Sequence, residues 1–441
     1  MKIVFILNHF LPDHIAGTEI YTWALSKQLI NKNHEVVVIT PNFKSQSITQ
    51  YEYEGIKVNG FPASPIQEKK IIMGLKLPKG LNEFKNILEK ENPDIIHFQE
   101  YSRGSGISVE HIKIAKSFNK PIITTFHIAQ YSCQTNELIY KGKQLCDGII
   151  NINKCSRCYL HKRKQDYLSK ILIPLSNILN FFKIDSRRWD NKIGTALGTT
   201  NTIKNLNTDL LKSISLSTKI IVLTDWYNKI LINNQVPKDK LVIIKQGLPQ
   251  NIFTINNNSI AENQLKLIYI GRITFEKGLH ILIDAVSKFK EYQIELDIYG
   301  QSTDLKYESD LKLKSLHLKN IKWKGILKKE DVQSTISNYD FLCLCSNFSE
   351  MSPLVIQEAF SVGVPVIASN VYGNAEQIKN GYNGLLFDNN NVNSLIEQLN
   401  KCISNRNLRE NLRNNISTPR KFESVANEHI SLYSSLMNLN L

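Results

Sequence analysis

The sequence lacks an apolar run long enough to cross a membrane. A membrane-spanning helix needs about 18 or more consecutive apolar residues, and no stretch of the 441 residues approaches that length. The opening segment, Met1–Leu7, is charged and then apolar, but it is shorter than a signal peptide and has no small-residue cleavage site. We therefore expect a buried first strand at Lys2–Leu7 and a chain that works in the cytoplasm.

Cysteine is scarce, with seven residues. An odd number of cysteines without an export signal argues against a disulfide framework. Four of the seven are clustered in one segment, at Cys133, Cys146, Cys155 and Cys158. Four thiolates suit tetrahedral zinc, with His161 as a further ligand. The alternatives are reduced thiols, or redox or iron–sulfur chemistry, and a metal here would hold a loop together without taking part in catalysis.

Acidic residues are too few to balance the basic ones in the first half of the chain. Residues 1–240 contain 33 Lys and Arg against 20 Asp and Glu, whereas residues 241–441 contain 21 against 20. This excess of positive charge indicates an anionic partner, such as a phospholipid surface or a lipid pyrophosphate. The alternative is a charge that only increases solubility. We expect no nucleic-acid partner, because no nucleic-acid-binding module accompanies the charge.

Short apolar runs alternate with helical stretches along most of the chain. Strands that are buried on both faces and alternate with helices form parallel sheets. We therefore expect an α/β protein with two doubly wound, Rossmann-like domains. The first series of predicted strands is 2–7, 35–40, 94–98, 121–126 and 219–223, and the second is 265–270, 294–299, 320–324, 340–345 and 365–368.

The composition also indicates where the domains begin and end. We expect a first domain over 1–245, interrupted by a cysteine-rich and basic insertion at about 131–215. A polar linker follows at 246–264, and the second domain covers 265–418. The final helix, within 419–441, is expected to pack back on the first domain.

Two segments of the second half carry polar residues directly after a predicted strand. Gly271 follows strand 265–270, and Arg272 and Lys277 precede a helix expected from Gly278. Arg272 offers a planar set of donors and Lys277 a mobile charge, which together suit a diphosphate. The alternative is two surface cations beside a turn.

The second of these segments carries two glutamates. Glu350 follows strand 340–345, and Glu358 lies about one turn inside a helix expected over Pro353–Ser361. Carboxylates in such positions accept hydrogen bonds from sugar hydroxyls, while the helix N-terminus attracts phosphate. The alternative is a capping carboxylate and a solvated one.

The spacing Glu350-x7-Glu358, with Ser352, Pro353 and Leu354 between the glutamates, resembles the paired-glutamate signature of the family-4 retaining glycosyltransferases. Segment 271–278 resembles the phosphate-binding motif of that family, and its later elements are matched at 363–365, 373–376 and 383–386. The resemblance implies a GT-B fold, in which two Rossmann-like domains face each other across a cleft. It also implies that a hexose-type sugar is transferred from a nucleotide-sugar donor with retention of anomeric configuration.

The resemblance assigns a role to each residue of these motifs. Arg272 and Lys277 would hold the donor diphosphate, Glu358 the nucleotide ribose, and Glu350 the hydroxyls of the transferred sugar. The backbone amides that would face the phosphate or the sugar belong to Met351, Ser352, Leu354 and Val355.

The first half resembles the same family at two places. Ala16-Gly17 stands where the family has a Gly-Gly loop whose amides approach the diphosphate. Ala16 departs from that pattern and Gly17 keeps it. His127 follows strand 121–126, where the family often has a histidine near the reacting sugar. Taken alone, His127 is equally well explained as a structural residue, but the resemblance favours a catalytic role beside Glu350.

The sequence contains no Asp-x-Asp motif suited to a catalytic Mg²⁺. We therefore expect no catalytic cofactor, with the charge of the leaving group neutralised by Arg272, Lys277 and a helix N-terminus. The expected acceptor is a lipid-linked or surface glycan of the polysaccharide or lipopolysaccharide type. The alternatives are a nucleotide-sugar epimerase or a phosphorylase on the same fold, or a non-catalytic GT-B assembly partner.

Residues 160–192 interleave apolar with basic residues, with eight Lys and Arg against three Asp and Glu. This pattern is typical of an amphipathic segment that lies on anionic lipid. It is equally compatible with a helical hairpin packed on the first domain. Together with the charge of residues 1–240, it favours a peripheral enzyme at the inner face of the membrane.

Overall fold

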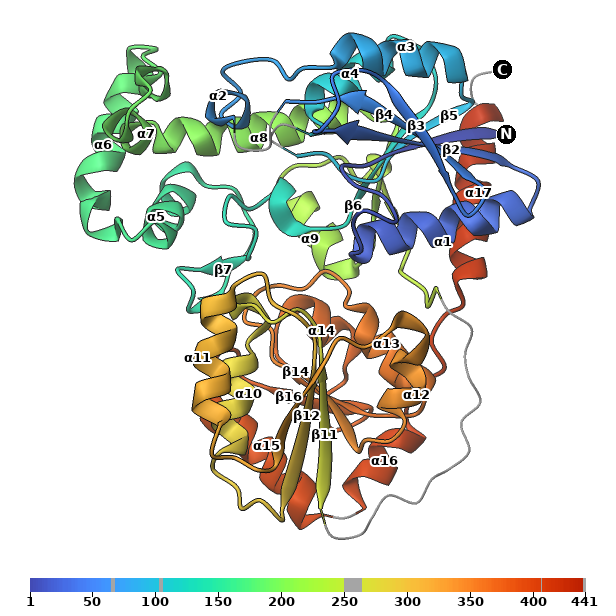
Figure 1. Ribbon diagram of the computed structural model, residues 1–441. Coiled ribbons are helices and arrows are strands. Elements are labelled where there is room, and N and C mark those ends of the chain that lie inside the picture. The colour runs from blue at the N-terminus through green and yellow to red at the C-terminus, as the bar shows by residue number, and fades with distance from the viewer. Residues whose placement is uncertain (65–67, 103–105, 250–263, 406, 439–441) are drawn as a thin grey trace. The chain divides into compact units, whose positions relative to one another are not determined.

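The computed structural model describes residues 1–64, 68–102, 106–249, 264–405 and 407–438 (Figure 1). Most of the predicted linker at 246–264 therefore lies outside the described residues. The chain divides into two compact units. The first contains Met1–Lys141, Cys146–Pro249 and the C-terminal segment from Phe422, and the second contains Gly142–Leu145 and Gln250–Lys421. No described helix has both the length and the apolar character needed to span a membrane.

The first unit is built on an eight-stranded sheet with the strand order β10-β9-β6-β5-β1-β2-β4-β3. All neighbouring strands are parallel except β3, which runs antiparallel to β4. The order reverses at β1, which has β2 on one side and β5 on the other. The strands are β1 (Lys2–Ile6), β2 (Glu35–Asn42), β3 (Thr49–Tyr53), β4 (Ile56–Pro62), β5 (Ile95–Phe98), β6 (Ile122–Phe126), β9 (Lys219–Val222) and β10 (Leu241–Ile243).

The β3–β4 hairpin is an element that the sequence analysis missed. Its two-residue turn consists of Glu54 and Gly55, which have φ angles of 47° and 80°. A turn with positive φ at both central residues matches the twist of the flanking strands. Gly55 after an acidic residue, between two runs with β-branched and aromatic side chains, was the local signal for this hairpin.

Residues 131–215 interrupt the strand–helix alternation, as expected. They form the small hairpin β7 (Ile139–Tyr140) and β8 (Gln144–Leu145), followed by a group of helices. In this group α5, α6 and α7 each pack against α8, and in Figure 1 they lie beside α8, away from the sheet. The elements are α5 (Ile152–Lys162), η2 (Asp166–Leu168), α6 (Ser169–Phe181), η3 (Ser186–Trp189), α7 (Lys192–Leu197) and α8 (Thr199–Leu216).

The other helices of the first unit cover its sheet. The last of them, α17, packs against α1, where the Tyr21 hydroxyl lies 3.3 Å from His429 Nε2. Tyr433 of α17 also bonds to His97 of β5, with 2.7 Å between its hydroxyl and Nδ1. The C-terminal helix is thus part of the first unit. These helices are α1 (Gly17–Asn31), α2 (Lys69–Ile72), α3 (Leu81–Glu91), α4 (Val109–Lys116), η1 (Ala129–Tyr131), α9 (Asp225–Asn233), η4 (Lys238–Lys240) and α17 (Phe422–Asn438).

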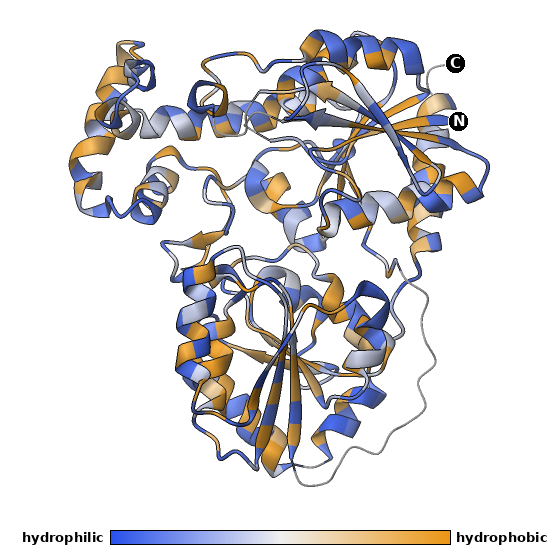
Figure 2. Cartoon of the chain, viewed as in Figure 1, coloured by the Kyte–Doolittle hydropathy of each residue, from blue (hydrophilic) through white to orange (hydrophobic). Residues whose placement is uncertain are grey.

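The second unit is a six-stranded, fully parallel sheet with the strand order β13-β12-β11-β14-β15-β16. Its order reverses between β11 and β14, as in a doubly wound sheet. Two clusters of buried apolar residues pack on this sheet, and Figure 2 shows hydrophobic residues concentrated on the strands of both units. The strands are β11 (Leu265–Ile270), β12 (Ile294–Tyr299), β13 (Ile321–Gly325), β14 (Phe341–Leu344), β15 (Val366–Ser369) and β16 (Gly384–Phe387).

The helices of the second unit connect these strands. All five strands predicted for this half are present, within about two residues of the expected ends, and β16 is an additional strand. The helices are η5 (Phe275–Lys277), α10 (Leu279–Val286), α11 (Leu305–Ser315), η6 (Lys329–Asp331), α12 (Val332–Ile336), α13 (Leu354–Ser361), α14 (Tyr372–Gln377), α15 (Val392–Ser404) and α16 (Leu408–Asn414).

Candidate functional site

Both motifs of the second half lie at the point where the strand order of the second sheet reverses. Arg272 and Lys277 follow β11, and Glu350 follows β14, which is the neighbour of β11 on the other side of the reversal. Ligands of doubly wound sheets bind at this switch point, outside the carboxyl ends of the strands. The topology therefore brings together residues that are more than 70 positions apart in the sequence.

A glycine allows the two loops to approach each other closely. Gly278 has a φ of 68°, and a Cβ atom at this position would lie 1.9 Å from the carbonyl oxygen of Cys345, at the end of β14. Any other residue would push the loops apart. Asn347 joins them further, because its backbone N–H donates to the Glu276 carbonyl at 2.9 Å and its side chain donates to the Phe275 carbonyl at 3.0 Å.

Lys277 and Glu350 form an ion pair between these loops. Lys277 Nζ lies 2.5 Å from Glu350 Oε1, and the side chains are 17% and 10% exposed. The same carboxylate oxygen accepts a hydrogen bond from the Ser346 hydroxyl at 2.6 Å. Lys277 also lies over the Phe348 ring, 5.2 Å from its centroid. A charged pair so shielded from water is held firmly in place, and both groups stand where the sequence analysis expected donor contacts.

Arg272 is exposed, and its guanidinium makes no ion pair or hydrogen bond with any residue that the structure describes. Its backbone carbonyl accepts a hydrogen bond from the Tyr269 hydroxyl at 2.9 Å, which fixes the start of the loop. A fixed backbone with a free guanidinium at a switch point suits the bidentate recognition of a phosphate.

Helix α13 starts at Leu354, one residue later than predicted, because Pro353 is its N-cap in an extended conformation with ψ 121°. The amides of the first turn of a helix have no partner inside the helix and carry its positive partial charge. Leu354 and Val355 belong to this turn, and Met351 and Ser352 directly precede Pro353. Gly373 of α14 packs against the start of this segment, since a Cβ atom at Gly373 would lie 2.1 Å from the Glu350 carbonyl oxygen and 2.6 Å from that of Met351.

Glu358 lies on the fifth residue of α13 and is half-buried. Loss of hydration raises the pKa of Glu358 to about 7, although the charge of Lys329 opposes this shift. The carboxyl group makes no hydrogen bond or ion pair within the described parts of the chain. It is therefore available to accept hydrogen bonds from a ligand.

The first unit has a cavity of about 1170 Å³ at the switch point of its own sheet. It is lined by Asn8 and His9 after β1, by Glu100 after β5, and by Ala16 at the start of α1. Gly17 is exposed at the N-terminus of α1, and a Cβ at this position would meet no atom within 4 Å. There is thus open space above the amides that the sequence analysis assigned to ligand binding.

Two carboxylates in this cavity were not assigned as site residues from the sequence. Glu19 is 3% exposed, with one oxygen 2.9 Å from His14 Nδ1 and the other without a hydrogen-bond partner in the described chain. Glu100 accepts a hydrogen bond from the Asn8 backbone N–H at 2.8 Å, and burial raises its pKa. The position of Glu100 directly after a buried parallel strand was the signal that could have identified it.

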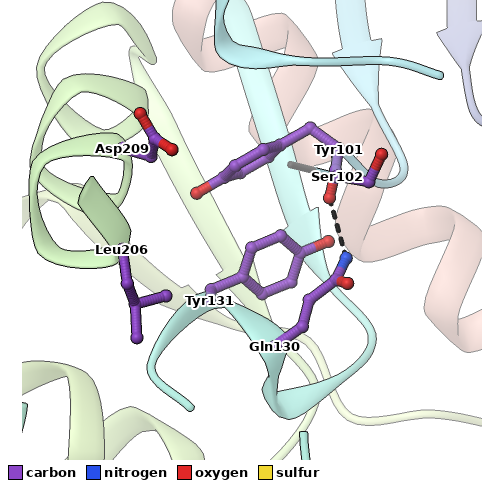
Figure 3. A pocket seen from close by; sticks show the side chains of 6 residues that line it. All are labelled: Tyr101, Ser102, Gln130, Tyr131, Leu206 and Asp209. Carbon is purple, nitrogen blue, oxygen red and sulfur yellow. Dashed lines mark hydrogen bonds between the residues drawn. The ribbon is translucent and has the colours of Figure 1, made fainter. Parts of the chain in front are cut away.

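A smaller hollow of about 10 Å³ lies beside this cavity and shares Ser102, Gln130 and Asp209 with it. Figure 3 shows the Tyr101 and Tyr131 rings side by side in its wall, with centroids 4.7 Å apart. Gln130 donates a hydrogen bond to the Tyr101 carbonyl at 2.8 Å. This hydrogen bond connects η1 to the loop after β5, and both segments contribute residues to the wall of the large cavity.

His127 is buried at the end of β6 and does not line the 1170 Å³ cavity, although Ile128 does. Its Nε2 lies 2.9 Å from Gln99 Oε1, and its ring meets the Tyr21 ring edge-on at 4.8 Å. Burial, helped by the nearby His429, lowers the pKa of His127 to about 3. The imidazole is therefore neutral at physiological pH, and its catalytic role stays a prediction.

The four clustered cysteines line one cavity of about 20 Å³. Cys155 and Cys158 lie on α5, and burial raises the pKa of the Cys155 thiol to about 11. The Lys141 backbone N–H donates to Cys158 Sγ at 3.4 Å. Within the described chain, no group of three or more His, Cys, Asp or Glu residues is arranged to hold a metal ion as it stands. A structural zinc therefore stays a prediction, as does any part for His161.

Comparison with known proteins connects these two sites to an activity. Residues 15–166 match a model of "Glycosyltransferase Family 4", and residues 251–418 match a model of "Glycosyl transferases group 1". The first match includes Gly17, Glu19 and Glu100 of the first unit, and the second includes Arg272, Lys277 and Glu350 of the second unit. The chain is a GT-B glycosyltransferase.

Individual relatives agree with this assignment. An uncharacterized glycosyltransferase of Methanocaldococcus jannaschii is 20% identical over 100% of this chain and 99% of its own length. The capsular polysaccharide biosynthesis glycosyltransferase CapM of Staphylococcus aureus is 25% identical, over 45% of this chain and 56% of its own length. The structure of HepE from Anabaena with UDP-glucose superposes with a TM-score of 0.61 at 15% identity, covering 99% of this glycosyltransferase and 100% of HepE. The predicted fold class is thus confirmed.

Proposed function

We propose that this glycosyltransferase transfers a hexose-type sugar from a nucleotide-sugar donor to a lipid-linked or surface-glycan acceptor. The reaction would retain the anomeric configuration and need no catalytic metal. The observation that carries the proposal is the convergence of Arg272, Lys277 and Glu350 at the switch point of the second sheet, next to the first turn of α13.

The chemistry of these groups suggests which part of the donor each of them binds. Arg272, Lys277 and the amides of Leu354 and Val355 would surround the diphosphate with positive charge, which stabilises the phosphate as it leaves. Glu350, held by Ser346, would accept hydrogen bonds from the hydroxyls of the sugar.

Glu358 of α13 would accept hydrogen bonds from the ribose of the nucleotide. Retention, as the family resemblance implies, would have the acceptor attack from the face of the leaving group. The departing phosphate would then help to remove the proton of the acceptor.

The relatives support the classes of donor and acceptor. HepE has been crystallised with UDP-glucose, and CapM is named for the biosynthesis of capsular polysaccharide. We infer from them a nucleotide-sugar donor, with UDP as the first nucleotide to test. We also infer an acceptor that is an intermediate in the synthesis of a surface polysaccharide.

The large cavity of the first unit supports a bulky acceptor. Its volume of about 1170 Å³ exceeds the roughly 300–1,000 Å³ of sites for small molecules. The carboxylates of Glu19 and Glu100 supply hydrogen-bond acceptors for sugar hydroxyls, and residues 71–78 supply an apolar wall. This combination fits a glycan on a lipid carrier, and we place the enzyme on the inner face of an anionic membrane.

Donor binding can be tested without knowledge of the acceptor. The purified protein is heated with UDP-, GDP- and ADP-sugars, with EDTA throughout. A donor at ~100 times its dissociation constant should add about 2.7 kcal/mol to the free energy of unfolding. Glu350→Ala should lose the additional stabilisation by the sugar and keep that by the nucleotide. No stabilisation by any of the three donors in the unaltered protein would contradict the proposed activity.

The stereochemistry needs a separate measurement. Once a donor is identified, NMR of the product formed on a candidate acceptor shows the anomeric configuration. A product with inverted configuration would contradict retention and leave the donor site unaffected.

A further inference from the structure

We propose that the exposed face of α6 is a membrane-docking surface that inserts into the headgroup region of an anionic bilayer. The docking surface is defined by Tyr167, Ile171, Leu175, Ile178, Phe181 and Phe182. It extends the proposed function by naming the element that meets the membrane, and it depends on that function only for the presence of an acceptor in the membrane.

The docking surface is an apolar stripe along one side of the helix. At 3.6 residues per turn, Ile171, Leu175, Ile178 and Phe182 fall within about 40° of one direction. These four side chains are exposed. The other two residues of the docking surface, Phe181 and Tyr167, are 82% and 78% exposed. Figure 2 shows hydrophobic residues along α6 accordingly. An exposed stripe of this length on a surface helix indicates a binding partner.

The opposite face of α6 fixes the helix to the rest of the first unit. Ser169, Ile173 and Ser176 are buried there. The Ser176 and Thr200 hydroxyls are hydrogen-bonded at 2.6 Å, and the Asn180 side chain donates to the same Thr200 oxygen at 2.6 Å. Packing on the first unit is therefore compatible with an amphipathic helix, because α6 packs against α5 and α8 with one face and leaves its apolar face exposed.

The charges beside the docking surface favour anionic lipid. Lys164, Lys170, Lys183, Arg188 and Lys192 are exposed and form no ion pair with any described residue. The three acidic residues of the segment are already engaged. Asp166 pairs with Lys141 at 2.9 Å, Asp185 with Arg187 at 2.6 Å, and Asp190 with Lys70 at 3.5 Å.

The same charges argue against a second copy of this chain as the partner. A symmetric contact through α6 would bring together two segments that each carry eight Lys and Arg against three Asp and Glu, and like charges oppose each other strongly where water is excluded. An anionic bilayer attracts these cations and also provides apolar depth for the stripe. The aromatic side chains of Tyr167, Phe181 and Phe182 suit the boundary between headgroups and acyl chains.

The test is co-sedimentation of the full chain with lipid vesicles, without donor or acceptor. We expect binding to phosphatidylcholine vesicles that contain about one-third phosphatidylglycerol, and weak binding to pure phosphatidylcholine. Replacing Ile171, Leu175 and Ile178 together by serine should weaken binding roughly hundredfold, because three apolar side chains no longer enter the bilayer. Replacing Lys170 and Lys183 by glutamine should weaken it about tenfold or more and reduce its dependence on salt.

Matched controls come from the second unit. Leu305, Leu313 and Leu316 of α11 and its C-cap are as exposed as the α6 residues, and their replacement by serine should leave vesicle binding unchanged. Lys319→Gln with Lys328→Gln is the corresponding charge control. Melting temperatures within about 2 °C of the unaltered protein would show that the variants are folded.

Three results would overturn the proposal. The first is no binding to anionic vesicles, and the second is equal loss in the α6 and α11 variants. The third is sedimentation velocity that shows a dimer which the α6 serine variant converts to a monomer. Because no donor is present, failure here would leave the proposed transferase activity untouched, and failure of donor binding would leave the docking surface untouched.

Discussion

Replacement of Arg272 by alanine should separate ligand binding from fold stability. The guanidinium is exposed and has no ion-pair or hydrogen-bond partner in the described chain, and surface substitutions of this kind change the free energy of unfolding by about 0.5 kcal/mol or less. A hydrogen bond to a charged group contributes about 1.5–3 kcal/mol. With tenfold for each 1.4 kcal/mol, Arg272→Ala should weaken donor binding roughly ten- to hundredfold without lowering the melting temperature.

Replacement of Lys277 by alanine should instead lower both the affinity for the donor and the melting temperature. Its ion pair with Glu350 is 2.5 Å long and largely shielded from water. The substitution therefore leaves a poorly hydrated carboxylate whose remaining hydrogen bond, among the described residues, comes from the Ser346 hydroxyl. Loss of a fully buried partner costs about 3–5 kcal/mol, and this partly exposed pair should cost about 2 kcal/mol. For a unit of this size that corresponds to a melting temperature roughly 4–8 °C lower.

Calorimetry and thermal melts of the two variants provide the measurements. The donor is titrated by isothermal calorimetry into each variant and the unaltered protein at equal ionic strength, and melting is followed without ligand. Lys277→Arg serves as a control that keeps the charge. Unchanged donor affinity in Arg272→Ala would refute the assignment of the diphosphate site, and an unchanged melting temperature in Lys277→Ala would refute the energy assigned to the ion pair.

Three further predictions concern titratable groups. Because the pKa of Glu358 is raised to about 7, the carboxylate proposed to bind the ribose forms only as the pH rises through 7. Donor affinity should therefore increase from pH 6 to pH 8, and Glu358→Gln should remove this dependence. Calorimetric titrations at both pH values measure the change. Because His127 has a pKa of about 3, His127→Asn should lower turnover without changing the shape of the pH–rate profile above pH 5, and a lost acidic limb would contradict a neutral imidazole. If zinc joins the clustered cysteines, elemental analysis should find about one zinc per chain. Cys155→Ser with Cys158→Ser should abolish this zinc, and Cys402→Ala should not. Absence of zinc from the unaltered protein would contradict the structural zinc and leave reduced thiols or redox or iron–sulfur chemistry.

Much of the fold could be predicted because the strands of a parallel sheet are buried on both faces. Apolar runs such as Leu265–Ile270 and Ile294–Tyr299 have the bounds expected from the sequence. One of the strands that were missed, β3, has an exposed face. Thr49–Tyr53 alternates between half-buried and exposed residues at the edge of the sheet, so it lacks the continuous apolar run by which the buried parallel strands were recognised.

The proposed donor motifs could be located in the sequence because each is short and follows a single strand. Arg272 and Lys277 lie within seven residues of the end of β11, and Glu350 lies six residues after β14. Their pairing could not be predicted from spacing, since it depends on which strands are neighbours. The ion pair between Lys277 and Glu350 is a property of the strand order β11-β14.

Most of the cavity of the first unit could not be predicted from the sequence, for a physical reason. This cavity is assembled from Glu19 in the first turn of α1, Glu100 after β5, residues 71–78 and α8 residues such as Lys212, which are far apart in the sequence. Glu19 is 3% exposed, and one of its carboxylate oxygens has no hydrogen-bond partner among the described residues, so its burial costs free energy. Neither this burial nor the missing partner can be read from the sequence around Glu19, because both depend on residues that the fold brings to α1 from other elements.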